Sequence, residues 1–98
     1  TVGTSGSTDT TGTSAKFNKP RGITTDGTNL YVTGFSNNRI RKIVISSGVV
    51  TTLAGSGSPG SVDATGTSAK FWNPTGITTD GTNLYVTDFS SHTIRKIE

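Results

Sequence analysis

The chain has 98 residues, enough for one small domain or a few stacked repeat units, and it carries a net charge of +3. Leu, Ile, Val and Phe supply only 21 residues, close to the ~20% below which chains tend to be disordered, yet disorder also needs high net charge. The absence of cysteine excludes a disulfide framework, and a single histidine makes a structural zinc site implausible, so we expect no cofactor. A chain this small and this poor in apolar residues is expected to need association with a partner.

The sequence shows no targeting or membrane segment. No apolar run approaches the ~18 residues of a membrane-spanning helix, and the first ten residues lack the charged start and apolar centre of a signal peptide. We therefore expect a soluble chain without a membrane partner, while the composition leaves its compartment open.

Taken in order, the chain begins with a loop and continues with four short strands. The first 14 residues are almost wholly Gly, Ser, Thr and Asp, which supply turns rather than buried surface. Phe17 is the first large apolar residue, and Pro20 and Gly22 mark the start of a strand. The strands are predicted from β-branched runs, alternation and the hairpin dipeptide Asp26-Gly27. Their expected ranges are Ile23 to Thr25, Leu30 to Thr33, Arg39 to Ile45 and Val49 to Leu53.

The same pattern is then written a second time. Residues 1–44 align with residues 55–98 at an offset of 54 without a gap, and 30 of the 44 positions are identical. Residues 45–54 have no second copy. We therefore predict a four-stranded unit over residues 1–54 and a three-stranded unit, without an outer strand, over residues 55–98.

Short antiparallel strands with glycine turns at this repeat length are typical of the blades of an all-β propeller. The residues F-x-x-P-x-G-I-x-x-D-G, then L-Y-V, then N-x-x-I-R-K resemble the NHL repeat, a four-stranded propeller blade, over essentially the whole chain. The name-giving Asn-His pair of that family falls at Asn37-Asn38 and Ser91-His92, so each copy keeps one member. The family's Asp after L-Y-V is present as Asp88 and replaced by Gly34.

The resemblance implies two blades per chain, with the first strand of each lining a central channel. Apolar residues on both faces of the third strand, such as Ile40 and Ile43, also predict sheets covered from two sides. Two blades cannot close a ring, so we predict a homo-oligomer in which about three or four chains supply six or eight blades, with an open stack as the alternative. The unpaired edge of the second unit favours pairing with another chain. Its residues are Ile94, Arg95, Lys96 and Ile97.

Candidate catalytic residues are few. Asp88 and His92 are the only pair that suggests a metal site or a general base, and no third ligand or nucleophile accompanies them, so we predict no catalytic residue, no metal site and no enzyme. Asp88 is expected to brace the turn before the third strand, and His92 to cap it. Asp26 and Asp80 are expected to be turn residues. The pattern Gly55-Ser56-Gly57 precedes no predicted helix, so it does not indicate a phosphate-binding loop.

A nucleic-acid partner is considered because some NHL propellers bind single-stranded RNA on one face. The low net charge argues against it, as does the expectation that the aromatic residues are buried rather than interleaved with cations. The basic residues of the third strands are Arg39, Arg41, Lys42, Arg95 and Lys96. The aromatic residues expected to be buried are Tyr31, Tyr85, Phe35 and Phe89.

The loop before the first strand differs most between the copies, reading Asn-Lys-Pro-Arg in one and Trp-Asn-Pro-Thr in the other. The propeller resemblance places this loop on one rim, which makes Lys19, Arg21 and Trp72 candidate binding residues. Packing of Trp72 against an adjacent blade or another chain is the alternative.

The sequence as a whole favours a non-enzymatic structural or interaction module, a propeller fragment that self-assembles into a larger propeller. The alternative is a ligand-binding module that takes single-stranded RNA or carbohydrate on one rim. An enzyme ranks third, because NHL-like propellers include metal-dependent lyases but the His and Tyr constellation that they need is not visible in this sequence.

Overall fold

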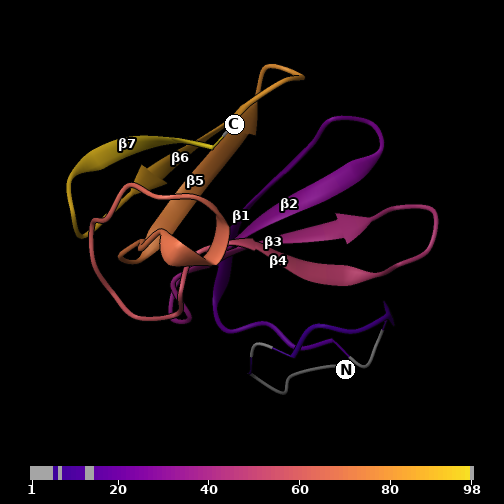
Figure 1. The fold of residues 1–98 in the computed structure, drawn as a ribbon. Coiled ribbons are helices and arrows are strands. Elements are labelled where there is room, and N and C mark those ends of the chain that lie inside the picture. Colours follow the sequence, from indigo (N-terminus) through magenta and orange to yellow (C-terminus); the bar gives the residue numbers. More distant parts are fainter. Residues whose placement is uncertain (1–5, 7, 13–14, 98) are drawn as a thin grey trace.

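The computed structural model describes residue 6, residues 8–12 and residues 15–97. This part of the chain forms two antiparallel sheets and almost no helix, which confirms the predicted all-β class (Figure 1). In each sheet every strand pairs with its neighbour in sequence. The first sheet consists of β1 (Pro20–Thr25), β2 (Asn29–Gly34), β3 (Arg39–Val44) and β4 (Val50–Ala54), and the second of β5 (Pro74–Thr79), β6 (Leu84–Asp88) and β7 (Thr93–Ile97), with the 3₁₀ helix η2 (Gly66–Ser68) in the loop between them.

The first strand of each sheet is longer than the sequence pattern indicates. β1 begins at Pro20 and β5 at Pro74, because a proline at the first position of a strand removes no ladder hydrogen bond that the strand needs. The pairing of β1 with β2 shifts register between Pro20 and Ile23, and the second sheet repeats that irregularity. The other strand ends differ from the expected ones by about one residue. None of the helical residues described forms a helix long and apolar enough to cross a membrane.

The tight hairpins β1–β2 and β5–β6 are fixed by the predicted aspartates. Asp26 Oδ1 accepts hydrogen bonds from the backbone N–H of Asn29 at 2.9 Å and of Thr28 at 3.0 Å, and the Tyr31 hydroxyl donates to Oδ2 at 2.9 Å. These bonds favour the ionised carboxylate, the amide of Asn29 most, and lower the pKa of Asp26 below its usual value. The turn-residue prediction is confirmed in both copies. The second hairpin repeats the bonds with Asp80, Thr82, Asn83 and Tyr85.

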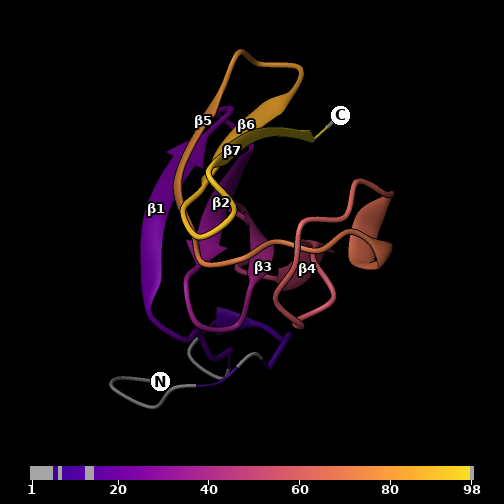
Figure 2. The same cartoon turned by 90° about the vertical axis from the view of Figure 1, so that its left-hand side faces the viewer.

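The two sheets pack against each other, with β1 running beside β5 (Figure 2). Ile40 of β3 is fully buried at the centre of this contact. The second sheet and its preceding loop supply Phe71, Val86 and Ala69 to the same apolar cluster. Burying an isoleucine completely contributes roughly 1.5–3 kcal/mol, so this contact is a main source of the chain's stability. Leu53, Ile77 and Ile97 are partly buried against the cluster.

Only one face of each sheet is covered in this way. Ile40 faces the second sheet, whereas Ile43, three residues further along β3, lines a groove on the opposite face. At Ile40 and Arg41 the prediction that the third strand is covered from two sides is met, because the second sheet covers one face and the loop before β1 covers Arg41 on the other. At Ile43, which is half-buried, no second sheet lies over that other face among the described residues.

Candidate functional site

Arg41, one of the basic residues considered for nucleic-acid binding, is fully buried. Its guanidinium donates to the Asp9 carboxylate from Nε at 2.9 Å, and to the backbone carbonyls of Lys16 and Thr8, each at 2.9 Å. It also lies 4.9 Å from the centre of the Phe17 ring. The planar fork of donors thus fastens the loop before β1 to the sheet, and the charge is not presented to a ligand.

Arg95 repeats this arrangement in the second sheet. Its guanidinium donates to Asp63 Oδ1 at 3.0 Å and to the carbonyls of Lys70 at 2.9 Å and Val62 at 2.8 Å. It lies 4.7 Å from the centre of the Phe71 ring. Two of the five basic residues considered for nucleic-acid binding are therefore structural, which weakens that hypothesis further.

Asp88 is a bracing residue rather than a free carboxylate. It is buried, accepts the Trp72 backbone N–H at 2.7 Å and the Ser91 hydroxyl at 2.8 Å, and pairs with Arg95 at 3.2 Å. The prediction that it braces the turn before the third strand is confirmed. His92 lies apart on the surface with a left-handed backbone (φ 58°), and its side chain makes no hydrogen bond to any described residue, so the predicted cap is not observed. Across the residues that the structure places, no three His, Cys, Asp or Glu side chains gather in a way that could hold a metal ion.

The first copy has Gly34 at the position of Asp88, and the side chain of Asn37 occupies the space beside this glycine. A Cβ at Gly34 would overlap the side-chain amide of Asn37, which is buried and occupies that space. Neither amide atom of Asn37 has a hydrogen-bond partner among the described residues. The two copies therefore fill the same site with different polar groups.

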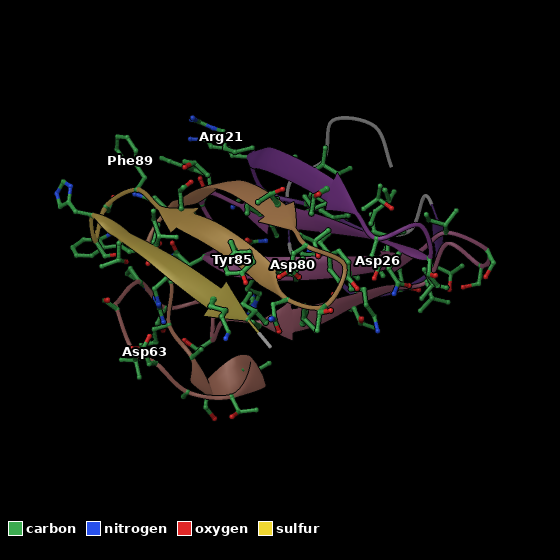
Figure 3. All side chains as sticks on the ribbon, turned by 90° about the horizontal axis from the view of Figure 1, so that it is seen from above. Arg21, Asp26, Asp63, Asp80, Tyr85 and Phe89 are labelled. Atoms are coloured by element: carbon green, nitrogen blue, oxygen red, sulfur yellow. The ribbon has the colours of Figure 1, made fainter. Side chains whose placement is uncertain are left out.

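On the rim, the structure joins Arg21 to two aromatic rings. The Arg21 guanidinium lies 4.1 Å from the centre of the Phe35 ring, and the centres of the Phe35 and Phe89 rings are 6.4 Å apart. Figure 3 shows Arg21 and Phe89 near each other and away from the hairpin at Asp26. Trp72 is 45% exposed and Lys19 is exposed with φ 49°, so all three predicted rim residues lie on the surface.

The expectation that the aromatic residues are buried was wrong for Phe89, which is 66% exposed. The reason is that no further sheet lies over β6 and β7 among the described residues. Phe35, Tyr31 and Tyr85 are half-buried. Burial raises the pKa of Tyr31, whose hydroxyl reaches the exposed Asp26 carboxylate.

Repeat-related positions on the two sheets differ sharply in burial. Ile40 is 0% exposed, and its counterpart Ile94 is 77% exposed. Thr33 is fully buried, accepts the Gly22 N–H and donates to the carbonyl of Thr75 across the sheet contact, both at 2.8 Å. Its counterpart Thr87 is exposed. We name the surface of the second sheet formed by Thr87, Phe89, His92 and Ile94 the open face.

The first sheet carries an apolar groove on the face turned away from the second sheet. It has a volume of about 310 Å³ and is almost wholly apolar in its lining, with Ile23 62% exposed. We name this surface the open groove. Its residues are Phe17, Pro20, Arg21, Gly22, Ile23, Val32 and Ile43.

The predicted assembly edge lies on β7. β7 pairs with β6, and no described strand lies on its other side. Beside it is a cavity of about 330 Å³ bordered by Asp63, Phe71 and Arg95. In the first sheet, β4 pairs with β3 at the corresponding position. Of the predicted edge residues, Ile94 and Lys96 are exposed, Ile97 is half-buried and Arg95 is buried against the loop.

Sequence reasoning missed two features. It did not pair Asp9 with Arg41 or Asp63 with Arg95, although both pairs recur at the offset of 54 and that recurrence was a usable signal. It also did not identify the open groove, because the residues that line it come from a loop and from three strands.

No protein-family model and no curated protein matches the chain. Solved structures do. A Bacteroides thetaiotaomicron protein of unknown function is similar over 95% of this chain and 24% of its own, with a TM-score of 0.89 and 30% identity. An auxiliary nutrient binding protein of the same species is similar over 98% of this chain and 26% of its own, with a TM-score of 0.85 and 27% identity. A third Bacteroides thetaiotaomicron protein, described provisionally as a phosphatase, is similar over 97% of this chain and 24% of its own, with a TM-score of 0.84 and 28% identity.

The chain thus spans about a quarter of the length of the solved structures that it matches. The two antiparallel sheets, each a sequential meander packed on the next, together with these matches to larger chains, are consistent with a fragment of a β-propeller.

Proposed function

We propose that the chain is a non-enzymatic interaction module made of two NHL-type propeller blades, and that it associates with copies of itself into a larger propeller. The observation that carries this proposal is the unequal burial of Ile40 and Ile94, which occupy the same position of the repeat. A position that is buried wherever a neighbouring sheet is present, and exposed where it is absent, is typical of a repeat that lacks its next neighbour.

The hydrogen bonds accepted by three of the carboxylates support a role without catalysis. The carboxylates of Asp26 and Asp80 accept hydrogen bonds from hairpin amides and tyrosine hydroxyls. Asp88 is held by three partners. A general base must be able to take up a proton, and the hydrogen bonds of the two hairpins favour the ionised carboxylate and hold the pKa of Asp26 and of Asp80 below its usual value, which makes both weak bases. Each of these groups has instead a structural task.

The number of copies follows from closure. If each chain contributes two blades, about three chains complete a six-bladed ring and about four complete an eight-bladed one. Sedimentation equilibrium of the 98-residue chain tests the proposal. The expected mass is about three or four times the 10.1 kDa of one chain. A single-chain mass at every concentration up to the solubility limit would overturn it.

A second candidate is ligand binding on the rim. It is favoured by the cluster of the exposed Arg21 and Phe89 with the half-buried Phe35, by the exposed Trp72, and by the nutrient-binding description of one similar structure. Exposed aromatic rings stack on sugar rings and on nucleobases alike. The candidate binding residue Lys19 lies beside this cluster, because its carbonyl accepts the backbone N–H of Phe35 at 3.1 Å.

Titration calorimetry with maltohexaose and with a single-stranded oligouridine tests this candidate. Binding that is lost in Trp72→Ala while the assembled mass is kept would support a rim site. If the assembly of Trp72→Ala instead dissociates into single chains, Trp72 is a packing residue. Absence of heat with either probe at millimolar concentration would count against a rim site for carbohydrate or RNA.

A further inference from the structure

The contact between the two sheets provides a template for a contact between two chains. Within one chain, Ile40 of the first sheet packs against Phe71 and Val86 of the second. Thr33 donates a hydrogen bond across the same contact to the carbonyl of Thr75 at 2.8 Å. Ile40 and Thr33 of the first sheet thus meet an apolar surface and a carbonyl of the second. We name that apolar surface, formed by Phe71, Ile77, Val86 and Ile97, the bed.

A second hydrogen bond crosses at the rim end of the contact. Asn38 Oδ1 accepts the backbone N–H of Asn73 at 2.9 Å. Asn38 and Asn73 both have left-handed backbones, with φ of 55° and 53°. Their counterparts His92 and Lys19 have φ of 58° and 49°, so the backbone geometry of this connection is present at both ends of the chain.

Shifting each partner by 54 residues gives two surfaces that the chain leaves uncovered. Ile40 corresponds to Ile94 and Thr33 to Thr87, both exposed on the open face. The bed that receives Ile40 corresponds to residues of the open groove. Phe71, Ile77, Val86 and Ile97 correspond to Phe17, Ile23, Val32 and Ile43.

We propose that the open face of one copy docks into the open groove of a second copy, with Ile94 seated between Phe17 and Val32 as Ile40 is seated between Phe71 and Val86. This inference rests on the proposed function and adds to it the surfaces, the partner and the direction of assembly. Thr87 donates to the carbonyl of Arg21 in the second copy, the counterpart of Thr75. A His92 ring nitrogen takes the accepting role that Asn38 Oδ1 has within the chain.

The occupant is a second copy because the two surfaces are repeats of two surfaces that already bind each other. The lining residues of groove and bed that correspond are identical in type, and so are Ile94 and Ile40. Because the face and the groove are different surfaces, the contact is heterologous and runs head to tail. It closes into a ring or continues as a stack, and it cannot stop at a symmetric dimer.

A mixing experiment tests the direction. Ile94→Lys disables the face, because its ammonium would meet Arg21 and apolar side chains, and Ile23→Lys disables the groove. Each variant alone should sediment as a single chain, with association weakened at least about tenfold. An equimolar mixture should form a one-to-one pair and nothing larger. The Ile23→Lys chain keeps an intact open face, the Ile94→Lys chain keeps an intact open groove, and no other intact surface remains. Val62→Lys, at an exposed apolar position outside both surfaces, should assemble as the wild type does.

Circular dichroism checks that each variant keeps its sheet content, and Ile94→Thr with Ile23→Thr provides a milder pair if a lysine variant unfolds. Either lysine variant assembling by itself as the wild type does, or a mixture that stays as single chains, would overturn the docking proposal while the wild-type mass still supports self-association. A wild type that is a single chain at all concentrations would overturn the proposed function itself.

Discussion

Replacing the same residue at the two matched positions, Ile40→Ala and Ile94→Ala, separates burial within the chain from burial between chains. Ile→Ala deletes about three methyl or methylene groups, worth about 0.8 kcal/mol each when buried, and leaves a cavity in addition. Ile40 is 0% exposed, so we expect a loss of about 3 kcal/mol in the free energy of unfolding. Ile94 is 77% exposed, so less than a quarter of that, about 0.5 kcal/mol, should be lost from a single chain.

Urea unfolding followed by the fluorescence of Trp72 measures both losses. With a slope of about 2 kcal/mol per molar urea, the midpoint should fall by about 1.5 M for Ile40→Ala and by about 0.25 M for Ile94→Ala. These values apply at protein concentrations where the wild type sediments as single chains. At higher concentrations the cost of Ile94→Ala should grow, because the assembled state is then part of the folded state. Equal shifts in the single-chain regime would refute the reasoning.

Three further predictions concern stability. Arg41→Met should cost about 2–3 kcal/mol in urea unfolding, because it keeps the apolar stem but removes the charged donor to Asp9 Oδ1 and to the carbonyls of Lys16 and Thr8. Gly22→Ala should cost about 1–3 kcal/mol, because its Cβ would overlap the carbonyl oxygen of Thr75 at the sheet contact. The hydrogen bonds from the hairpin amides hold the folded-state pKa of Asp26 below its usual value, so the stability that the ionised carboxylate contributes is present above the unfolded pKa and should be lost as the pH falls through the folded pKa. Asp26→Asn should flatten that part of a pH series of melting temperatures.

Matched variants control these predictions. Gly76→Ala should cost less than Gly22→Ala, because its Cβ would meet the exposed Thr87 side chain rather than backbone of the other sheet. Gly27 has φ 95° with open space around it, so Gly27→Ala reports backbone strain without overlap. An Arg41→Met variant as stable as the wild type would show that the loop before β1 is held by other contacts. An unchanged acid limb in Asp26→Asn would assign the acid sensitivity to other carboxylates.

The open face and the open groove also explain why the rim cluster and the assembly surfaces overlap. Arg21 lines the groove and also stacks on Phe35, while Phe89 lies beside Phe35 and belongs to the open face. Docking of a second copy would therefore bury part of the rim cluster. We expect ligand binding at this rim, if it is found, to depend on the assembled state.

The local structure can be predicted from the order of the amino acids. Asp26-Gly27 and Asp80-Gly81 specify hairpins through the aspartate's own hydrogen bonds, which reach only two or three residues along the chain. The alternation of apolar residues and the gapless duplication indicated short strands, repeated units and an all-β fold. These features depend on neighbours in sequence, so the order of the amino acids is sufficient to predict them.

Which surfaces are buried depends on the packing of the two sheets and cannot be predicted from the local sequence. Ile40 and Ile94 both stand directly before Arg-Lys-Ile and on the same kind of strand, so no local pattern distinguishes them, yet one is fully buried and the other mostly exposed. Asp9 and Arg41 meet although they lie 32 positions apart in the chain. Burial and ion pairing depend on what lies across space from a side chain, and a sheet is covered only where another sheet is present to cover it.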